Sequence, residues 1–121
     1  MSAGTELDGP DPLIGEIVRL NDLDTGFSLR NPKEGRPYCI VGVGGVRVRV
    51  VPMSTSGGEG VEVPAEVVGH LEAGWFVPKP STVRKSLVVG ARNDGLLPDP
   101  YLSAVLDQDK PSAIRKYSDE R

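Results

Sequence analysis

Two apolar runs separated by a pair of glycines constrain the fold of this chain more than any other feature. Residues 38–43 and 46–51 are rich in β-branched side chains, and Gly44-Gly45 lies between them. Such a pattern predicts an antiparallel hairpin closed by a tight turn. Because the open ends of a hairpin lie together, we expect Arg36, before the first strand, to lie beside Ser54, after the second.

The second run alternates strictly between valine and arginine. In residues 46–50, valines occupy every other position and Arg47 and Arg49 lie between them. Since successive side chains of a strand point to opposite faces, this strand should have one buried face and one cationic, solvated face.

The rest of the chain predicts a mainly β domain with many turns. The 121 residues include 15 glycines and 11 prolines, and a chain of this length forms one domain. We assign residues 13–109 to that domain and residues 1–12 and 110–121 to disordered tails. Further strands are expected over residues 14–20, 61–63, 75–77 and 82–89, short helices over 64–71 and 100–108, a turn at 93–95, and a long polar loop over 21–34. This content favours a small, strongly curved β barrel with one or two short helices, one of them near the C-terminus.

Charge is unevenly distributed, although the net charge is only −3. Residues 28–90 carry eight basic and five acidic side chains, whereas residues 1–27 and 91–121 are both net acidic. The central segment is therefore the part suited to a polyanion such as nucleic acid. With no apolar run long enough to cross a membrane, no secretion signal and a single cysteine, we expect a soluble, cytoplasmic protein that does not bind membranes.

Several kinds of chemistry are disfavoured by the residues present. His70 is the only histidine, so a pair of catalytic histidines is impossible, and it is expected to be structural. Cys39 lies within an apolar strand and should pack in the core. No spacing of potential ligands indicates a metal site, and we expect no cofactor. Gly42-Val-Gly-Gly45 is explained by the hairpin turn rather than by a phosphate-binding loop.

The remaining candidate site is Arg36 with the three hydroxyl residues Ser54, Thr55 and Ser56. An arginine can hold a phosphate bidentately and neutralise charge that develops on its oxygens, while a hydroxyl donates to the same group. Arg30, Lys33, Arg47 and Arg49 are the basic residues expected to support substrate binding. A structural interpretation also fits, in which Arg36 is a loop residue outside the core and the hydroxyls satisfy a turn.

Three short motifs, in this order, resemble the MazF/PemK-type endoribonuclease toxins of bacterial type II toxin-antitoxin systems. Gly15-Glu-Ile-Val18 is similar to the opening strand of that family. Glu34-Gly-Arg-Pro37 resembles its Gly-x-Arg-Pro loop, and Val51-Pro-Met-Ser-Thr-Ser56 resembles the strand that ends in its active-site hydroxyl.

This resemblance implies a small SH3-like barrel of the CcdB/MazF/PemK type, a homodimer, and an antitoxin protein as partner. It also implies metal-independent cleavage of single-stranded RNA by attack of the 2′-OH, which leaves a cyclic phosphate and a free 5′-OH. The catalytic arginine corresponds to Arg36, and the hydroxyl residue to Ser54 or to Thr55.

A second hypothesis is a non-catalytic β-barrel module. In this case the face that carries Arg47 and Arg49 would bind nucleic acid or a peptide partner, and Arg36 would have little importance.

Overall fold

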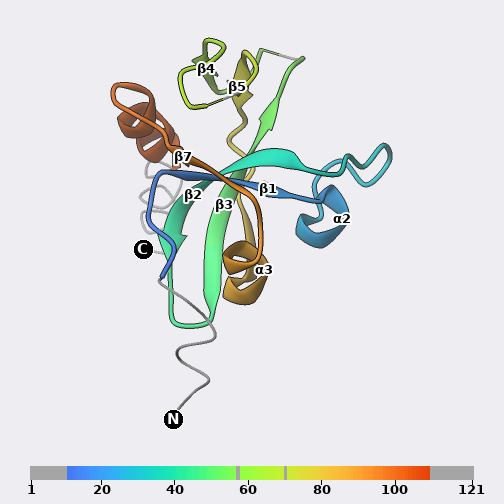
Figure 1. The fold of residues 1–121 in the computed structure, drawn as a ribbon. Coiled ribbons are helices and arrows are strands. Elements are labelled where there is room, and N and C mark those ends of the chain that lie inside the picture. Colours follow the sequence, from blue (N-terminus) through green and yellow to red (C-terminus); the bar gives the residue numbers. More distant parts are fainter. Residues whose placement is uncertain (1–10, 57, 70, 110–121) are drawn as a thin grey trace, which may run out of the picture.

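A computed structural model describes residues 11–56, 58–69 and 71–109, and these form a curled, antiparallel half-barrel with three short helices (Figure 1). The strands are β1 (Glu16–Leu20), β2 (Arg36–Val43), β3 (Arg47–Ser54), β4 (Val61–Val63), β5 (Gly74–Phe76), β6 (Ser81–Arg84) and β7 (Asn93–Leu96). The helices are α2 (Asp22–Thr25), α3 (Lys85–Val89) and a third over residues 101–109. The expectation of a mainly β fold with a helix near the C-terminus is confirmed.

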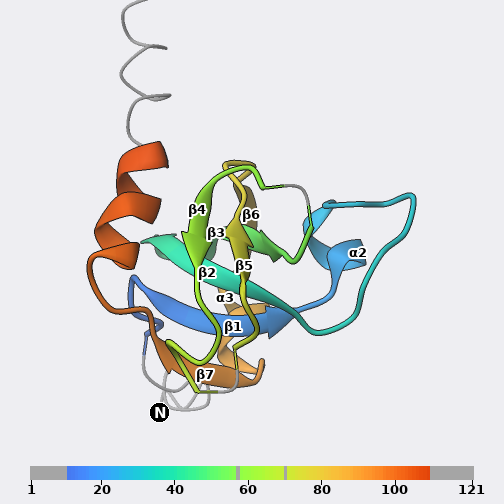
Figure 2. The same ribbon diagram turned by 90° about the horizontal axis from the view of Figure 1, so that it is seen from above.

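The sheet curls because β3 pairs with different partners along its length. The strand order is β4-β5-β3-β2-β1-β7, and β6 also pairs with β3. The first half of β3 pairs with β6, whereas Met53 and Ser54 at its end pair with β5. Figure 2 shows the resulting arrangement, in which β4 and β5 lie across the sheet formed by β1, β2 and β3. The end of β3 is therefore held from two sides, which fixes the backbone that leads into residues 54–56.

Residues 38–41 of β2 and residues 50–53 of β3 are buried on both faces, which explains the continuous apolar runs there. Cys39, Val41 and Val51 pack into one cluster with the helix over 101–109, and Tyr38, Ile40 and Val50 pack into a second cluster with β6 and α3. Alternate residues of one strand thus serve two cores.

The predicted hairpin is confirmed. Strands β2 and β3 pair from Tyr38 opposite Pro52 to Val43 opposite Val48, and the Gly44 N–H donates to the Arg47 carbonyl at 2.8 Å. The alternation is confirmed from Arg47 to Val50, because Val48 and Val50 are buried while Arg47 and Arg49 are exposed. It was wrong for Val46, which precedes β3 and is 76% exposed.

The segment expected to be a polar loop over 21–34 contains helix α2, so the described residues hold three short helices where one or two were expected. Three other local predictions were wrong. The described residues of the segment 64–71 form no helix. Glu66 has a φ of 64°, which a right-handed helix excludes. The segment instead contributes Val68 and Leu71 to the first cluster. Residues 82–89 are not one strand, because the chain turns into α3 after Arg84. In a strand, Val83 and Val88 would face opposite sides, and the helix returns Val88 to the cluster that contains Val83.

The third error concerns residues 93–95, which lie within strand β7 rather than in a turn. Gly95 adopts a φ of 116°, and the pairing of β7 with β1 shifts its register between Ile17 and Val18. Glycine permits this irregular strand, so its turn preference was overridden by pairing at the sheet edge.

Some expectations lie outside the described residues. These are the predicted tails, of which only Asp11 and Pro12 are described, and the role expected for His70. Within the described ranges, no helix is long and apolar enough to span a membrane.

Candidate functional site

Arg36 begins strand β2 and forms an ion pair with Asp22 in helix α2. The guanidinium donates from Nε to Oδ1 of Asp22 at 2.7 Å and from Nη2 to Oδ2 at 2.8 Å, so the contact is bidentate. Asp22 is fully buried, and only 7% of the Arg36 surface is exposed. The interpretation of Arg36 as a loop residue outside the core is therefore wrong.

Asp22 is the centre of a buried polar network. Its carboxylate also accepts hydrogen bonds from the Tyr38 hydroxyl at 2.8 Å and from the Lys33 backbone N–H at 2.9 Å, and the Tyr38 hydroxyl contacts that of Thr25 at 2.6 Å. Among the described residues, no buried side-chain nitrogen or oxygen lacks a hydrogen-bond partner. The network ties the segment between β1 and β2 to the sheet.

Two opposing effects set the protonation of this carboxylate. Burial by itself would raise the pKa of Asp22, but the hydrogen bonds from Arg36, Lys33 and Tyr38 and the charge of Arg36 outweigh it, so the pKa is lowered from 3.8. Burial, together with the adjacent Asp22 charge, raises the pKa of the Tyr38 hydroxyl. At neutral pH the site therefore holds an aspartate, a neutral tyrosine and an arginine.

Arg36 retains part of its hydrogen-bonding capacity. Its Nη1 donates to the Met53 carbonyl at 2.8 Å, which makes three assigned donors with the two to Asp22. A guanidinium has five N–H groups, so two are without a partner among the described residues. The ring of Phe27 also lies against it, 4.7 Å from Cζ to the ring centroid, and helps to hold it in place.

A pocket of about 170 Å³ opens beside Arg36. Its polar lining includes Thr55 from the segment after β3, Lys33 and Glu34 from the segment before β2, Arg19 from β1, and Glu72. The structure therefore brings Arg36, Lys33 and Thr55 together. The hairpin predicted that Arg36 would lie beside Ser54; Arg36 does lie at the end of β3, where it donates to the Met53 carbonyl, but Ser54 does not line the pocket. The structure also adds two carboxylates and Arg19, whose Nε lies 2.6 Å from Asp94.

Among the three hydroxyl residues, the geometry favours Thr55 over Ser54. The Ser54 hydroxyl donates to the Ser56 carbonyl at 2.5 Å and accepts from the Ser56 N–H at 3.2 Å, so it closes a local turn. Thr55 is exposed and lines the pocket, and its hydroxyl has no hydrogen bond within the described residues.

The other proposed binding residues are dispersed. Arg30 is exposed and is not among the residues that line the pocket. Arg47 and Ser54 lie at opposite ends of β3. Arg49 donates to Asp109 from Nη2 at 2.8 Å and from Nε at 3.1 Å, so an acid at the end of the C-terminal helix balances its charge.

Cys39 is fully buried, as expected for a core residue. Burial raises the pKa of its thiol to about 12, so it stays protonated at neutral pH. In the described part of the chain, no cluster of three or more histidine, cysteine, aspartate or glutamate side chains is arranged to hold a metal ion.

Sequence reasoning missed Asp22, the residue that most strongly shapes this site. It was counted only as one of several acids in a polar segment. The available signal was Tyr38, since a tyrosine inside an apolar strand needs a partner for its hydroxyl.

No protein-family model, curated protein or solved structure matches this chain.

Proposed function

We propose that this protein is a metal-independent endoribonuclease that cleaves single-stranded RNA in the pocket beside Arg36. The observation that carries the proposal is the convergence of Arg36 and Thr55 on one pocket from the open end of the β2–β3 hairpin. A guanidinium and a hydroxyl next to each other can both donate to the oxygens of one phosphodiester.

The reaction needs few protein groups because RNA supplies its own nucleophile. The 2′-oxygen attacks the adjacent phosphorus, the bond from phosphorus to the 5′-oxygen breaks, and the products are a 2′,3′-cyclic phosphate and a 5′-OH. In this scheme the two remaining N–H groups of Arg36 and the hydroxyl of Thr55 stabilise the charge that develops on the non-bridging oxygens. Alignment of the 2′-oxygen with the leaving oxygen is the other contribution of the pocket.

Proton transfer falls to groups in the pocket other than Arg36. The 2′-OH must lose a proton and the departing 5′-oxygen must gain one. Glu34 and Glu72 line the pocket, and a positioned carboxylate can act as a general base. We assign removal of the 2′-OH proton to one of the two carboxylates, and solvent water supplies the proton that the departing 5′-oxygen takes up.

Asp22 has the part of a positioning residue in this proposal. It fixes the plane of the guanidinium through two hydrogen bonds. It also neutralises the arginine, so Arg36 would contribute directed hydrogen bonds more than net charge, and Lys33 would supply part of the attraction for the phosphate.

The proposal extends to the family features that the three sequence motifs imply. These are an SH3-like barrel of the CcdB/MazF/PemK type, a homodimer, inhibition by an antitoxin protein and a cytoplasmic location. They rest on the sequence resemblance.

The test compares two single substitutions at exposed positions, because replacing buried Arg36 would disturb folding. Thr55→Val removes the pocket hydroxyl while keeping a similar side-chain shape, and Ser56→Ala is the matched control in the adjacent turn. The substrate is a single-stranded RNA labelled at one end, incubated with and without EDTA. We expect cleavage in both conditions, a rate lowered by about 10²–10³ in Thr55→Val, as for loss of one donor to a developing oxyanion, and a rate within about twofold of wild type in Ser56→Ala.

Purified wild-type protein that leaves the RNA intact would overturn the nuclease proposal and favour a non-catalytic nucleic-acid-binding module. Cleavage that EDTA abolishes, or that Thr55→Val leaves unchanged, would contradict the assigned mechanism.

A further inference from the structure

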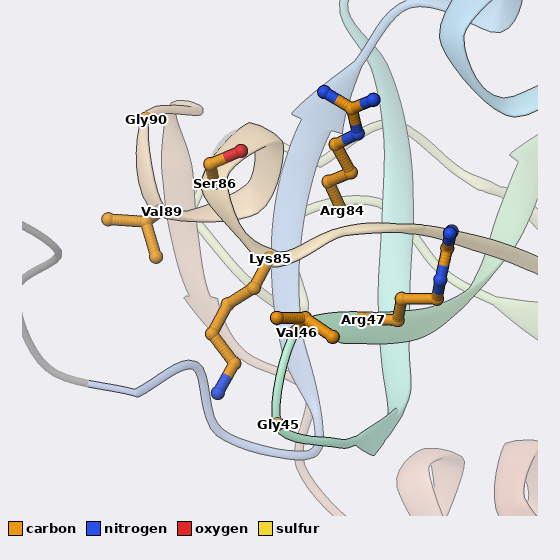
Figure 3. Close-up of a pocket in the computed structure, with 8 residues that line it drawn as sticks. All are labelled: Gly45, Val46, Arg47, Arg84, Lys85, Ser86, Val89 and Gly90. Atoms are coloured by element: carbon orange, nitrogen blue, oxygen red, sulfur yellow. The ribbon is translucent and has the colours of Figure 1, made fainter.

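A second hollow, larger than the pocket beside Arg36, lies at the opposite end of β3. It has a volume of about 540 Å³ and is lined by the end of the β2–β3 turn, the junction of β6 with α3, and the end of α3. Figure 3 shows Arg47 and Arg84 extending to one side of Val46, with Lys85 between Val46 and Val89 on the other side. We call this the β3–α3 groove.

Two arginines face each other across the strands at this groove. Arg47 of β3 lies directly opposite Arg84 of β6, and both side chains are exposed. Like charges at directly opposed positions destabilise a sheet. Neither arginine forms an ion pair within the described residues, so nothing shown in the structure offsets this repulsion.

Arg49 provides an internal comparison. It lies two residues further along the same face of β3, but there Thr82 is the opposite residue and Asp109 forms an ion pair with it. Among the described residues, the arginine of β3 without an acidic partner is therefore the one at the groove end of the strand.

The arrangement of charge around an apolar floor indicates a chain-like anion. Val46 is 76% exposed and Val89 is 36% exposed, so the floor can contact a flat apolar surface such as a nucleobase. Lys85 has a 3.3 Å contact with the carboxylate of Asp11; the Asp11 side chain is 76% exposed, whereas that of Lys85 is 17% exposed. Arg47 and Arg84 lie beside Val46, so a chain whose phosphate reaches the two arginines can also place an adjacent base on the apolar floor.

We propose that the β3–α3 groove binds single-stranded nucleic acid, with one backbone phosphate held between Arg47 and Arg84 and a base lying over Val46 and Val89. The volume falls within the roughly 300–1,000 Å³ of pockets that hold small organic groups. The groove is roughly 20 Å from the Arg36 pocket, the length of β3 at a rise of about 3.3 Å per residue. Binding of nucleic acid in this groove does not depend on the proposed cleavage, although a nuclease would gain a second contact with its substrate there.

The experiment measures binding of a fluorescent single-stranded 2′-O-methyl oligonucleotide, which lacks the 2′-OH and cannot be cleaved by the proposed reaction. The test variant is the double substitution Arg47→Gln with Arg84→Gln, and Arg49→Gln is the matched control on the same face. Fluorescence anisotropy is recorded over a range of salt concentrations. Thermal unfolding of each variant confirms that it is folded.

We expect the double variant to bind at least tenfold more weakly at low salt. The slope of log affinity against log salt should fall in magnitude by about 0.7, because the one phosphate held between the two arginines is lost. Its Tm should equal or exceed that of the wild type because the repulsion between the arginines is removed. Arg49→Gln should bind within about twofold of wild type, which confines the contact to the groove end of β3.

Four outcomes would overturn the proposal. These are no binding by the wild type, unchanged binding by the double variant, an equal loss in Arg49→Gln, and equally tight binding of a polyglutamate peptide, which would assign the groove to an acidic protein segment. A free mononucleotide is expected to compete at least a hundredfold more weakly than the oligonucleotide, and equal competition would overturn the assignment to a chain.

Discussion

Replacing Arg36 with glutamine should remove a large part of the stability of this protein. The substitution leaves the carboxylate of Asp22, which is fully buried, without its charged partner and deprives it of two hydrogen bonds. Breaking a buried ion pair from one side costs about 3–5 kcal/mol. A domain of this size has a total unfolding free energy of roughly 5–15 kcal/mol, so the variant should be marginally stable.

Arg49→Gln is the matched control, because it breaks an arginine–aspartate pair of similar length in an exposed place. Its Nη2 lies 2.8 Å from Oδ1 of Asp109, and 44% of the Arg49 side chain is exposed. Exposed pairs contribute about 1 kcal/mol or less. Burial, rather than the distance between the charged groups, should therefore separate the two variants.

Urea unfolding at pH 7, followed by circular dichroism, measures both free energies. We expect Arg36→Gln to lose at least about 2 kcal/mol more than Arg49→Gln, given the two ranges above. If the two variants lost the same amount, the burial of Asp22 and Arg36 would be wrong, and so would the geometry of the pocket built on them.

The same network and the core thiol give two further predictions. The pKa of Asp22 is lowered from 3.8 in the folded state. Ionisation of Asp22 therefore contributes its full stabilisation at pH values above the pKa of the unfolded chain. This contribution is lost as the pH falls through the lower pKa of the folded protein. Titration of the Asp22 carboxyl carbon by NMR should give a pKa below 3.8, and a value above it would contradict the network. Since burial raises the pKa of the Cys39 thiol to about 12, an alkylating reagent at pH 8 should label Cys39 only as fast as the protein unfolds, with labelling accelerated by urea. Rapid labelling of the native protein would show that the strand is not buried as described.

The hairpin could be predicted from sequence because its signals are local. Gly44-Gly45 sets the turn, and the alternation of valine with Arg47 and Arg49 sets the faces of β3. The proximity of Arg36 to the end of β3 followed from the pairing alone. These features depend on neighbours in the sequence or on one strand pair.

The errors arise where distant contacts outweigh local preference. Asp22 pairs with a residue 14 positions away, and no periodic pattern reports such a contact. Residues 64–71 resemble a helix with proline at its start, yet burial of Val68 and Leu71 against the sheet determines their path. Arg84 lay inside the strand predicted over residues 82–89. In the structure it is the last residue of β6 and lies opposite Arg47.

The most direct test of the central claim compares cleavage of two oligonucleotides of the same sequence in EDTA. One is single-stranded RNA, and the other carries a 2′-O-methyl group at every position. If Arg36 and Thr55 form a pocket that promotes attack by the 2′-OH, the RNA should be cut to fragments that end in a 2′,3′-cyclic phosphate, and the methylated strand should stay intact. Intact RNA, or equal cleavage of both strands, would contradict the account.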